Sequence, residues 1–439
     1  MPTDNKSSHP FYSRRTFIAK SLFGGLLGIF GIPYLSNGST KKNTLPKPKK
    51  NTDQNFKNLS WSEIKNEFSL GKNFFHFNTA SIGPSPNIVL EKIFEAMRLF
   101  AYLGTSKHNR VELTRTKIGK FLNADNELIA ITRNSTEGMN IVANSLCLKK
   151  GDEVILSKDE HIGGAAPWLA LSKEMGIKIK LVELDYSGNK NIEIIENSIS
   201  RKTKVVCISH VTCTTGMILP VKAIVELCKR RNIISCIDGA QAVGMIPVDV
   251  KSINPDFYIT CGHKWLFGPK GSGVLVMNRA FLTKNRPHFV GAYSDSKFDL
   301  GTKTIEYLNI ASREEYGTRN IPHIIGLGTA VDFISDLGIE RIAKRGRELS
   351  IRFTKGISNI SGIEIFTPKN QEYSCSLVTF KIKTKDNLQI SRDLITKNGI
   401  RVRFIYENDI RGLRASFAIF NNEEEVDLLI AAIKDAAII

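Results

Sequence analysis

The sequence predicts an α/β protein with a large, mainly parallel β-sheet covered by helices and a smaller C-terminal α+β domain. Short apolar runs of strand length recur between residues 128 and 277, and helix-like stretches separate several of them. After Asn320 this alternation gives way to a different pattern. Strands that alternate with helices favour an open parallel sheet with helices on both faces. Because ligands of such sheets bind beyond the carboxyl ends of the strands, we expect the functional residues there.

The elements of the large domain follow in chain order. The predicted strands are Leu128–Thr132, Glu153–Ser157, Ile177–Glu183, Lys204–His210, Ile233–Asp238, Asp256–Thr260 and Gly273–Met277. The predicted helices are Thr136–Leu146, Ala165–Met175 and Val221–Arg231. With 439 residues, 42% of them hydrophobic and 24% charged, the chain is long enough to bury a large core.

The C-terminal part predicts a smaller α+β domain. Its expected elements are a long helix over about Gly326–Lys355, a strand Ser376–Lys383, a helix Leu388–Lys397, two further strands and a terminal helix Glu423–Ala437. The sequence thus divides into a signal and basic linker (1–58), a large α/β domain with an N-terminal extension (59–320), and the small domain (321–439).

The first fifty residues predict an export signal. They hold nine lysines and arginines and one acid, Asp4, whereas the whole chain has a net charge of +18. Arg14 and Arg15 precede the uncharged apolar stretch Leu22–Leu35, which is shorter than the roughly 18 residues of a membrane span. Paired arginines before such a stretch are typical of the bacterial twin-arginine (Tat) route, which implies the export machinery as a partner and a periplasmic location. The alternative is a basic tail before a buried helix.

The composition gives little support for nucleic acid, membranes or metals as partners. The run Lys47–Lys50 lies in a polar stretch over residues 36–58, whose composition favours a solvated linker over a lipid or nucleic-acid contact. No nucleic-acid motif is visible, and membrane contact is expected only through the signal if it stays uncleaved. The seven cysteines form no CxxC pair, so neither a disulfide framework nor a metal site is predicted.

Two strand ends carry candidate catalytic residues. Asp238 ends an apolar strand and is followed by Gly239, Ala240 and Gln241. A carboxylate there can keep a pyridine-type ring protonated, although a strand-end aspartate is also a common helix cap. Lys264 follows the strand Asp256–Thr260, where desolvation would lower the pKa of its amine and make it nucleophilic. A solvated lysine is the alternative.

Two further features could bind anionic groups of a cofactor or substrate. Ser135 and Thr136 lie between a strand and a helix, where hydroxyls and free N–H groups can bind a phosphate or simply cap the helix. Arg414 lies in the small domain, and its guanidinium can clamp a substrate carboxylate or form a surface ion pair.

Together these residues resemble the class V branch of fold-type I pyridoxal-phosphate (PLP) enzymes, which includes cysteine desulfurases, kynureninases and isopenicillin N epimerase-like proteins. The likeness begins at Phe77-Asn78-Thr79-Ala80, which is similar to the family's opening strand, and runs to the C-terminus. Ser135 and Thr136 match the phosphate-binding turn, and His161 matches the histidine that stacks on the cofactor ring. The resemblance implies that Asp238 contacts the ring nitrogen, Ala240 the ring face and Gln241 the ring oxygen. It also implies that His263 contacts the phosphate and that Lys264 forms the Schiff base.

The resemblance also implies a homodimer with shared active sites. Gly317 and Thr318 match a turn that reaches the phosphate in the neighbouring subunit, and Arg319 can add a second charge for the substrate. Arg414 matches the carboxylate-binding arginine. The loop Phe404–Arg411 departs from the desulfurases because it has no cysteine. Cys261 stands where a phosphate-binding Ser or Thr is usual, and Cys213 where Asn or Ser is usual.

The sequence therefore predicts a PLP-dependent enzyme that acts on an amino-acid-like substrate through Lys264, with Asp238 and His161 as the other catalytic residues. Transamination is favoured because it needs only Lys264 to move protons. Epimerisation, for which no second base is identified, and lyase chemistry are the alternatives. A non-catalytic, exported protein of the same fold is an alternative of another class.

Overall fold

The computed structural model describes residues 56–105 and 108–438 of the chain. The predicted export signal with Arg14 and Arg15, and the basic run Lys47–Lys50, lie outside the described residues. Within the described ranges, no helix combines the length and the apolar character that crossing a membrane requires.

The large domain is built on one seven-stranded sheet with the order β2-β8-β7-β6-β5-β3-β4. Its strands are β2 (Ile129–Thr132), β3 (Glu153–Ser157), β4 (Lys178–Val182), β5 (Thr203–Ser209), β6 (Ile234–Asp238), β7 (Phe257–Cys261) and β8 (Gly273–Met277). Only β8 runs antiparallel to its neighbours in this sheet, β2 and β7. The mainly parallel sheet that the sequence predicts is confirmed.

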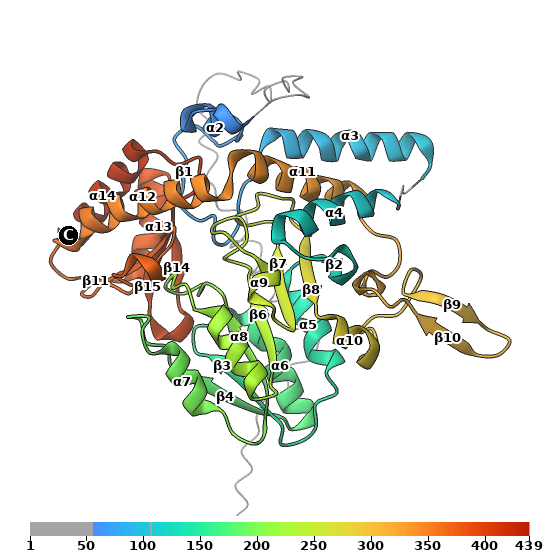
Figure 1. The fold of residues 1–439 in the computed structure, drawn as a ribbon. Helices are drawn as coiled ribbons and strands as arrows, with labels where there is room; N and C mark the ends of the chain where they lie inside the picture. The colour runs from blue at the N-terminus through green and yellow to red at the C-terminus, as the bar shows by residue number, and fades with distance from the viewer. Residues whose placement is uncertain (1–55, 106–107, 439) are drawn as a thin grey trace, which may run out of the picture. The chain divides into compact units, whose positions relative to one another are not determined.

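Side chains of the central strands are buried on both faces of the sheet. Along β5, Val206 and Ile208 pack into one hydrophobic cluster, whereas Val205 and Cys207 pack into another. Such burial on both sides produces continuous apolar runs and requires helices on each face. The helices of this domain are α3 (Asn87–Leu103), α4 (Arg110–Leu122), α5 (Ser135–Ser145), α6 (Ile162–Met175), α7 (Asn191–Ser198), α8 (Val221–Arg230), α9 (Val250–Ile253) and α10 (Arg279–Lys284) (Figure 1).

The small domain has an antiparallel sheet with the order β11-β12-β15-β14. Its strands are β11 (Ile363–Ile365), β12 (Leu377–Ile382), β14 (Arg403–Ile405) and β15 (Gly412–Ser416), and its helices are α12 (Ile339–Ser358), α13 (Asn387–Asn398) and α14 (Glu423–Ile438). Near the start of the described chain, after α2 (Trp61–Asn66), the strand β1 (Phe75–His76) pairs with β13 (Ile400–Arg401). Residues far apart in sequence therefore meet beside this sheet.

Two expectations about the elements are wrong. The single helix expected over about Gly326–Lys355 is two helices, α11 (Ile321–Leu337) and α12, because Gly338 between them has a φ of +81° and ends the first helix. The family-like segment Phe77–Ala80 is the turn after β1, which ends at His76. A domain boundary at residue 320, directly before α11, stays a prediction.

A β-hairpin that the sequence did not indicate extends from the large domain. It comprises β9 (Asp295–Asp299) and β10 (Thr304–Tyr307), which pair antiparallel (Figure 1). Most of its side chains are exposed, including Phe298 and Leu300. Without a buried face, the segment carries no alternating apolar pattern from which a strand can be predicted.

Candidate active site

The predicted site residues gather at the carboxyl edge of the large sheet. Asp238 is the last residue of β6, and Lys264 follows the end of β7 by three residues. His161 precedes α6 after the end of β3, and Ser135 begins α5 directly after β2. This edge is the position where open α/β sheets bind ligands.

Lys264 and Asp238 form the charged centre of this edge. Lys264 is only 9% exposed, and its amine makes no hydrogen bond or ion pair with any described residue. Asp238 accepts a hydrogen bond from the Ala240 N–H at 2.9 Å. Burial raises the pKa of Asp238, and the nearby positive charge of Lys264 partly opposes that shift. The amine is therefore unpaired, and the carboxylate keeps capacity for a further donor.

His161 presents a neutral ring beside these two groups. It caps α6, and its Nδ1 accepts a hydrogen bond from the Gly163 N–H at 3.0 Å. Burial, followed by the charge of Lys264, lowers the pKa of His161 to about 4. Gly164 approaches Asp238 so closely that a Cβ there would lie 3.2 Å from Oδ2 of the carboxylate. The start of α6 thus lies close against the carboxylate of Asp238.

A second group of donors can hold an anion. Ser135 and Thr136 occupy the first turn of α5, whose N-cap, Asn134, accepts a hydrogen bond from the Glu137 N–H at 2.8 Å. His263 has a buried Nδ1 without a hydrogen-bond partner, and burial lowers the pKa of its imidazole to about 4. A neutral imidazole can donate one N–H to an anion, and free backbone N–H groups at a helix start favour a phosphate.

Gln241 is fixed between two neighbours at the same edge. Its Nε2 donates to the carbonyl of Ala80 at 2.8 Å, and its Oε1 accepts from Trp265 Nε1 at 2.8 Å. One amide N–H of Gln241 remains available, as a contact to a ring oxygen requires. Cys261 contacts the Ala240 carbonyl, and burial raises the pKa of its thiol, so it is a neutral packing residue.

Arg414 brings a buried positive charge from the small domain. Its side chain is fully buried, with Nη1 donating to the carbonyl of Cys213 and Nη2 to Ser81 Oγ at 3.1 Å. Its Nε has no partner, and no carboxylate of the described residues pairs with the guanidinium. Burial, together with the charge of Arg403, lowers its pKa to about 10. A buried cation of this kind is satisfied by a carboxylate ligand.

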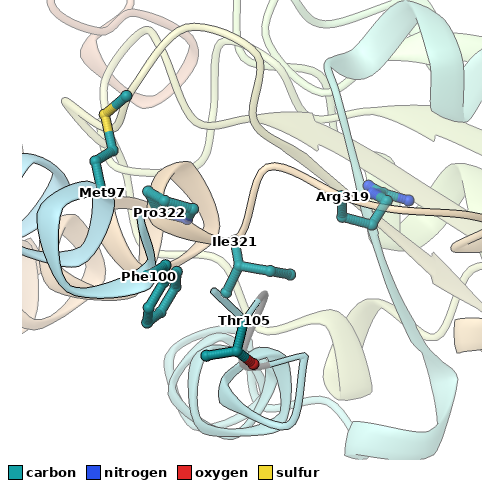
Figure 2. A pocket seen from close by; sticks show the side chains of 6 residues that line it. All are labelled: Met97, Phe100, Thr105, Arg319, Ile321 and Pro322. Carbon is teal, nitrogen blue, oxygen red and sulfur yellow. The ribbon is translucent and has the colours of Figure 1, made fainter. Parts of the chain in front are cut away.

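The structure does not bring Gly317, Thr318 and Arg319 to this group of residues. Arg319 Nη2 donates to the carbonyl of Ile131 at 2.6 Å, and the Gly317 N–H bonds to the carbonyl of Ala292. Figure 2 shows Arg319 beside a different pocket, of about 270 Å³, that Met97 and Phe100 of α3 also line. The contribution of Gly317 and Thr318 to a neighbouring subunit's site, and of Arg319 to substrate binding, stays a prediction.

Some residues at the site escaped sequence reasoning. Asp159 is fully buried and accepts hydrogen bonds from Thr214 Oγ1 at 2.5 Å and Tyr186 at 3.1 Å. Asn408 donates to the Tyr186 hydroxyl at 3.0 Å. Arg403 lies directly opposite Arg414 in the β14–β15 pairing. The alternation of apolar residues in these two strands could have predicted the register of their hairpin. That register would have placed Arg403 opposite Arg414.

Comparison with known proteins decides the family. The aminotransferase class-V model matches residues 95–429. The chain belongs to the class V aminotransferase family. A probable cysteine desulfurase of Halalkalibacterium halodurans is 31% identical over 388 residues, 82% of this chain and 92% of the relative. A cysteine desulfurase of Escherichia coli O7:K1 is 30% identical over 345 residues, 76% of this chain and 84% of the relative.

Solved structures of this class V fold agree with the architecture. The apo cysteine desulfurase of Thermococcus onnurineus NA1 has a TM-score of 0.78 and 25% identity, covering 85% of this chain and 97% of its own. The cystine C-S lyase C-DES, in complex with cysteine persulfide, has a TM-score of 0.76 and 26% identity, covering 83% of this chain and 97% of its own. The fold predicted from the sequence is thereby confirmed.

The cofactor of this class V enzyme is pyridoxal 5'-phosphate, and the residues present fit it. The unpartnered Nδ1 of His263 and the start of α5, with Ser135 and Thr136, offer donors for the phosphate. Asp238 has carboxylate capacity for a protonated ring nitrogen, and Lys264 has an unpaired amine. These residues therefore offer a partner for the phosphate, for the ring nitrogen and for the aldehyde of the cofactor.

Proposed function

We propose that this class V enzyme is an aminotransferase that acts at the α-carbon of an amino acid, with Lys264 carrying the cofactor. The proposal rests on two features that occur together. Among the described residues, Lys264 has a nearly buried amine without a hydrogen-bond partner, and Arg414 has a fully buried guanidinium without a carboxylate partner. The first is the group that reacts with an aldehyde, and the second is the group that binds an α-carboxylate.

Bound pyridoxal phosphate supplies an electron sink for the negative charge that develops at the substrate α-carbon. Arg414 binds the α-carboxylate in the place where no protein carboxylate competes for it. Lys264 would take the proton from the α-carbon and deliver it, on the same face, to the cofactor carbon that bears the transferred nitrogen. Asp238 would hold a proton on the ring nitrogen, and the neutral ring of His161 would supply a flat partner for the cofactor ring.

The proton-transfer groups favour transamination over epimerisation. Epimerisation needs an acid or base on each face of the α-carbon, whereas transamination needs one. Besides Lys264, a further candidate is His161, whose pKa of about 4 leaves it neutral near pH 7 and whose Nδ1 already accepts the Gly163 N–H. One amine therefore has to move every proton.

A lyase is the second candidate, because relatives of this chain are named cysteine desulfurases and one structural relative is a cystine C-S lyase. A desulfurase that passes sulfur to a cysteine of the 404–411 loop is disfavoured, since that loop has none. Cys213 is a poor acceptor, because burial raises the pKa of its thiol to about 12. If the chain is a lyase, we expect sulfur to leave as a free product.

The test is a visible absorption spectrum of the cofactor-loaded protein, followed by single turnovers with L- and D-amino acids. We expect a visible band that Lys264→Ala removes and that the control Lys270→Ala, at an exposed lysine, keeps. One keto acid per site without free ammonia supports transamination. Continuous release of ammonia, with sulfide from cysteine, supports the lyase. If no band forms after loading, the enzyme proposal is wrong and a binding protein of this fold remains.

We also propose that the protein is exported by the twin-arginine route to the periplasm. The support is the pair Arg14-Arg15 before an uncharged apolar stretch. Replacing both arginines by lysine should leave the folded protein in the cytoplasm, as measured by cell fractionation. Unchanged export of that variant would contradict the proposal.

A further inference from the structure

The fold places a second arginine beside the proposed carboxylate site. Arg403 on β14 is the direct partner of Arg414 on β15 in an antiparallel pairing. Residues directly opposite in such a pairing have their side chains on the same face, a few ångströms apart. Two like charges in that arrangement repel each other, and the charge of Arg403 contributes to the lowered pKa of Arg414. The pair therefore needs a compensating anion.

That anion is Glu407, and it compensates only one of the two arginines. Arg403 Nη2 forms an ion pair with Glu407 Oε1, and the two side chains are 19% and 7% exposed. Glu407 Oε2 also accepts the Tyr406 N–H at 3.2 Å. Arg414 has no such partner. Among the described residues, the site thus has one guanidinium without a carboxylate partner, that of Arg414, and one that a protein carboxylate already pairs with, that of Arg403.

The loop that carries Glu407 makes a second set of contacts, through Asn408. Asn408 donates to the Tyr186 hydroxyl, which in turn donates to Asp159. Asn408 and Asp409 both have positive φ values, 49° and 52°, in the left-handed region that asparagine and aspartate adopt more readily than most residues. The hydrogen bond of Asn408 and the ion pair of Glu407 therefore both hold the loop in place.

We propose that Glu407 is a specificity-determining residue: by occupying Arg403 it restricts the site to substrates with a single carboxylate, so that amino acids with an acidic side chain are rejected. The inference rests on the proposed function, because it takes Arg414 as the α-carboxylate site. A second substrate carboxylate near Arg403 would meet the negative charge of Glu407. Displacing Glu407 would leave a nearly buried carboxylate without its partner, which is strongly unfavourable.

The experiment measures binding rather than turnover. The cofactor-loaded protein is titrated with propionate and with succinate, unreactive ligands with one and two carboxylates, by calorimetry and by the change in the cofactor's visible band. We expect wild type to bind propionate more tightly than succinate. In Glu407→Gln, the ratio of the succinate to the propionate dissociation constant should fall at least tenfold, because Arg403 becomes free. Glu407→Ala gives the same test if the glutamine variant does not fold.

Two further variants identify the cause. Adding Arg403→Gln to Glu407→Gln should return the ratio to the wild-type value, because no free second guanidinium remains. Glu364→Gln, at an exposed ion pair with Lys383 in the same sheet, should leave the ratio unchanged. Tighter binding of succinate than of propionate by wild type, or a ratio within twofold of wild type in Glu407→Gln, would overturn the inference alone. If wild type binds neither ligand, the proposed function fails together with it.

Discussion

At the scale of single residues, the site is a set of charged groups removed from water without their usual partners. Arg414 is fully buried with no carboxylate, and Glu160 is 9% exposed with no cation. Glu160 accepts hydrogen bonds from Ser157 Oγ and Ser209 Oγ, each at 2.6 Å, and so links the ends of β3 and β5 beside His161. Burial is the main reason that its pKa rises to about 7. Such groups make stability depend on pH.

We expect Glu160→Gln to remove part of that dependence. The native pKa of Glu160 lies above its ordinary value of 4.5, so the native state binds the proton more tightly than the unfolded state. Its contribution to stability is full below about pH 4.5 and is lost as the pH rises to about 7. The loss amounts to about 3 kcal/mol. Denaturant unfolding between pH 5 and 8 should show a shallower decline for the variant.

An equally steep decline in the variant would contradict this assignment. Glu314, whose pKa burial also raises to about 7, contributes in the same direction in both proteins, so some decline with pH remains in the variant.

The residues that sequence reasoning found and missed differ in one physical respect. Lys264, Asp238 and His161 follow strand ends, and the carboxyl edge of a parallel sheet brings strand ends together whatever the details of packing. Arg403 and Tyr186 reach the site through strand register and loop conformation. The position of Arg403 follows from the register of a short hairpin, whereas that of Tyr186 depends on contacts between distant loops that no local pattern of the chain contains.

At the scale of elements, burial decided what could be predicted. The strands of the large sheet were located to within one or two residues because apolar side chains pack on both of their faces. The β9–β10 hairpin, with its exposed side chains, gave no such pattern. The break between α11 and α12 was missed because a single glycine, Gly338, interrupts an otherwise continuous helical pattern.

Replacing Gly338 by alanine should destabilise the protein. Its φ of +81° disfavours any residue with a Cβ, and a Cβ there would meet no atom within 4 Å. The decrease in the free energy of unfolding therefore comes from backbone conformation alone, and we expect it to be about 1 kcal/mol or somewhat more. Thermal or denaturant unfolding measures it. Gly291→Ala, where φ is not positive and the nearest atom is 3.5 Å away, is the matched control and should change stability little.

At the scale of the whole molecule, the apolar surface supports the proposed homodimer. Helix α3 exposes Phe94 and Met97 to 59% and 48%, beside the pocket that Arg319 lines. Exposed apolar side chains gathered on one helix indicate a protein interface. We propose that a second copy of the chain covers this face and that Gly317 and Thr318 reach its site.

Light scattering of the cofactor-loaded protein should give twice the mass of one chain. Phe94→Asp, at an exposed position, should weaken dimerisation at least tenfold and lower the retention of cofactor. Leu181→Asp, at an exposed leucine on the edge strand β4, is the control and should remain a dimer. A wild-type monomer that retains its cofactor would contradict a shared site.

The contacts of the turn after β1 have a consequence for the order in which the protein is made. The Gly83 N–H bonds to the carbonyl of His263, and the Ala80 carbonyl accepts from Gln241. The Ala80 N–H bonds to Ser416 Oγ, 336 positions later in the chain. The turn after β1, the segment with Gln241 and His263, and β15 must therefore all be present before the site is complete. A growing chain on the ribosome therefore cannot complete the site until β15 has emerged.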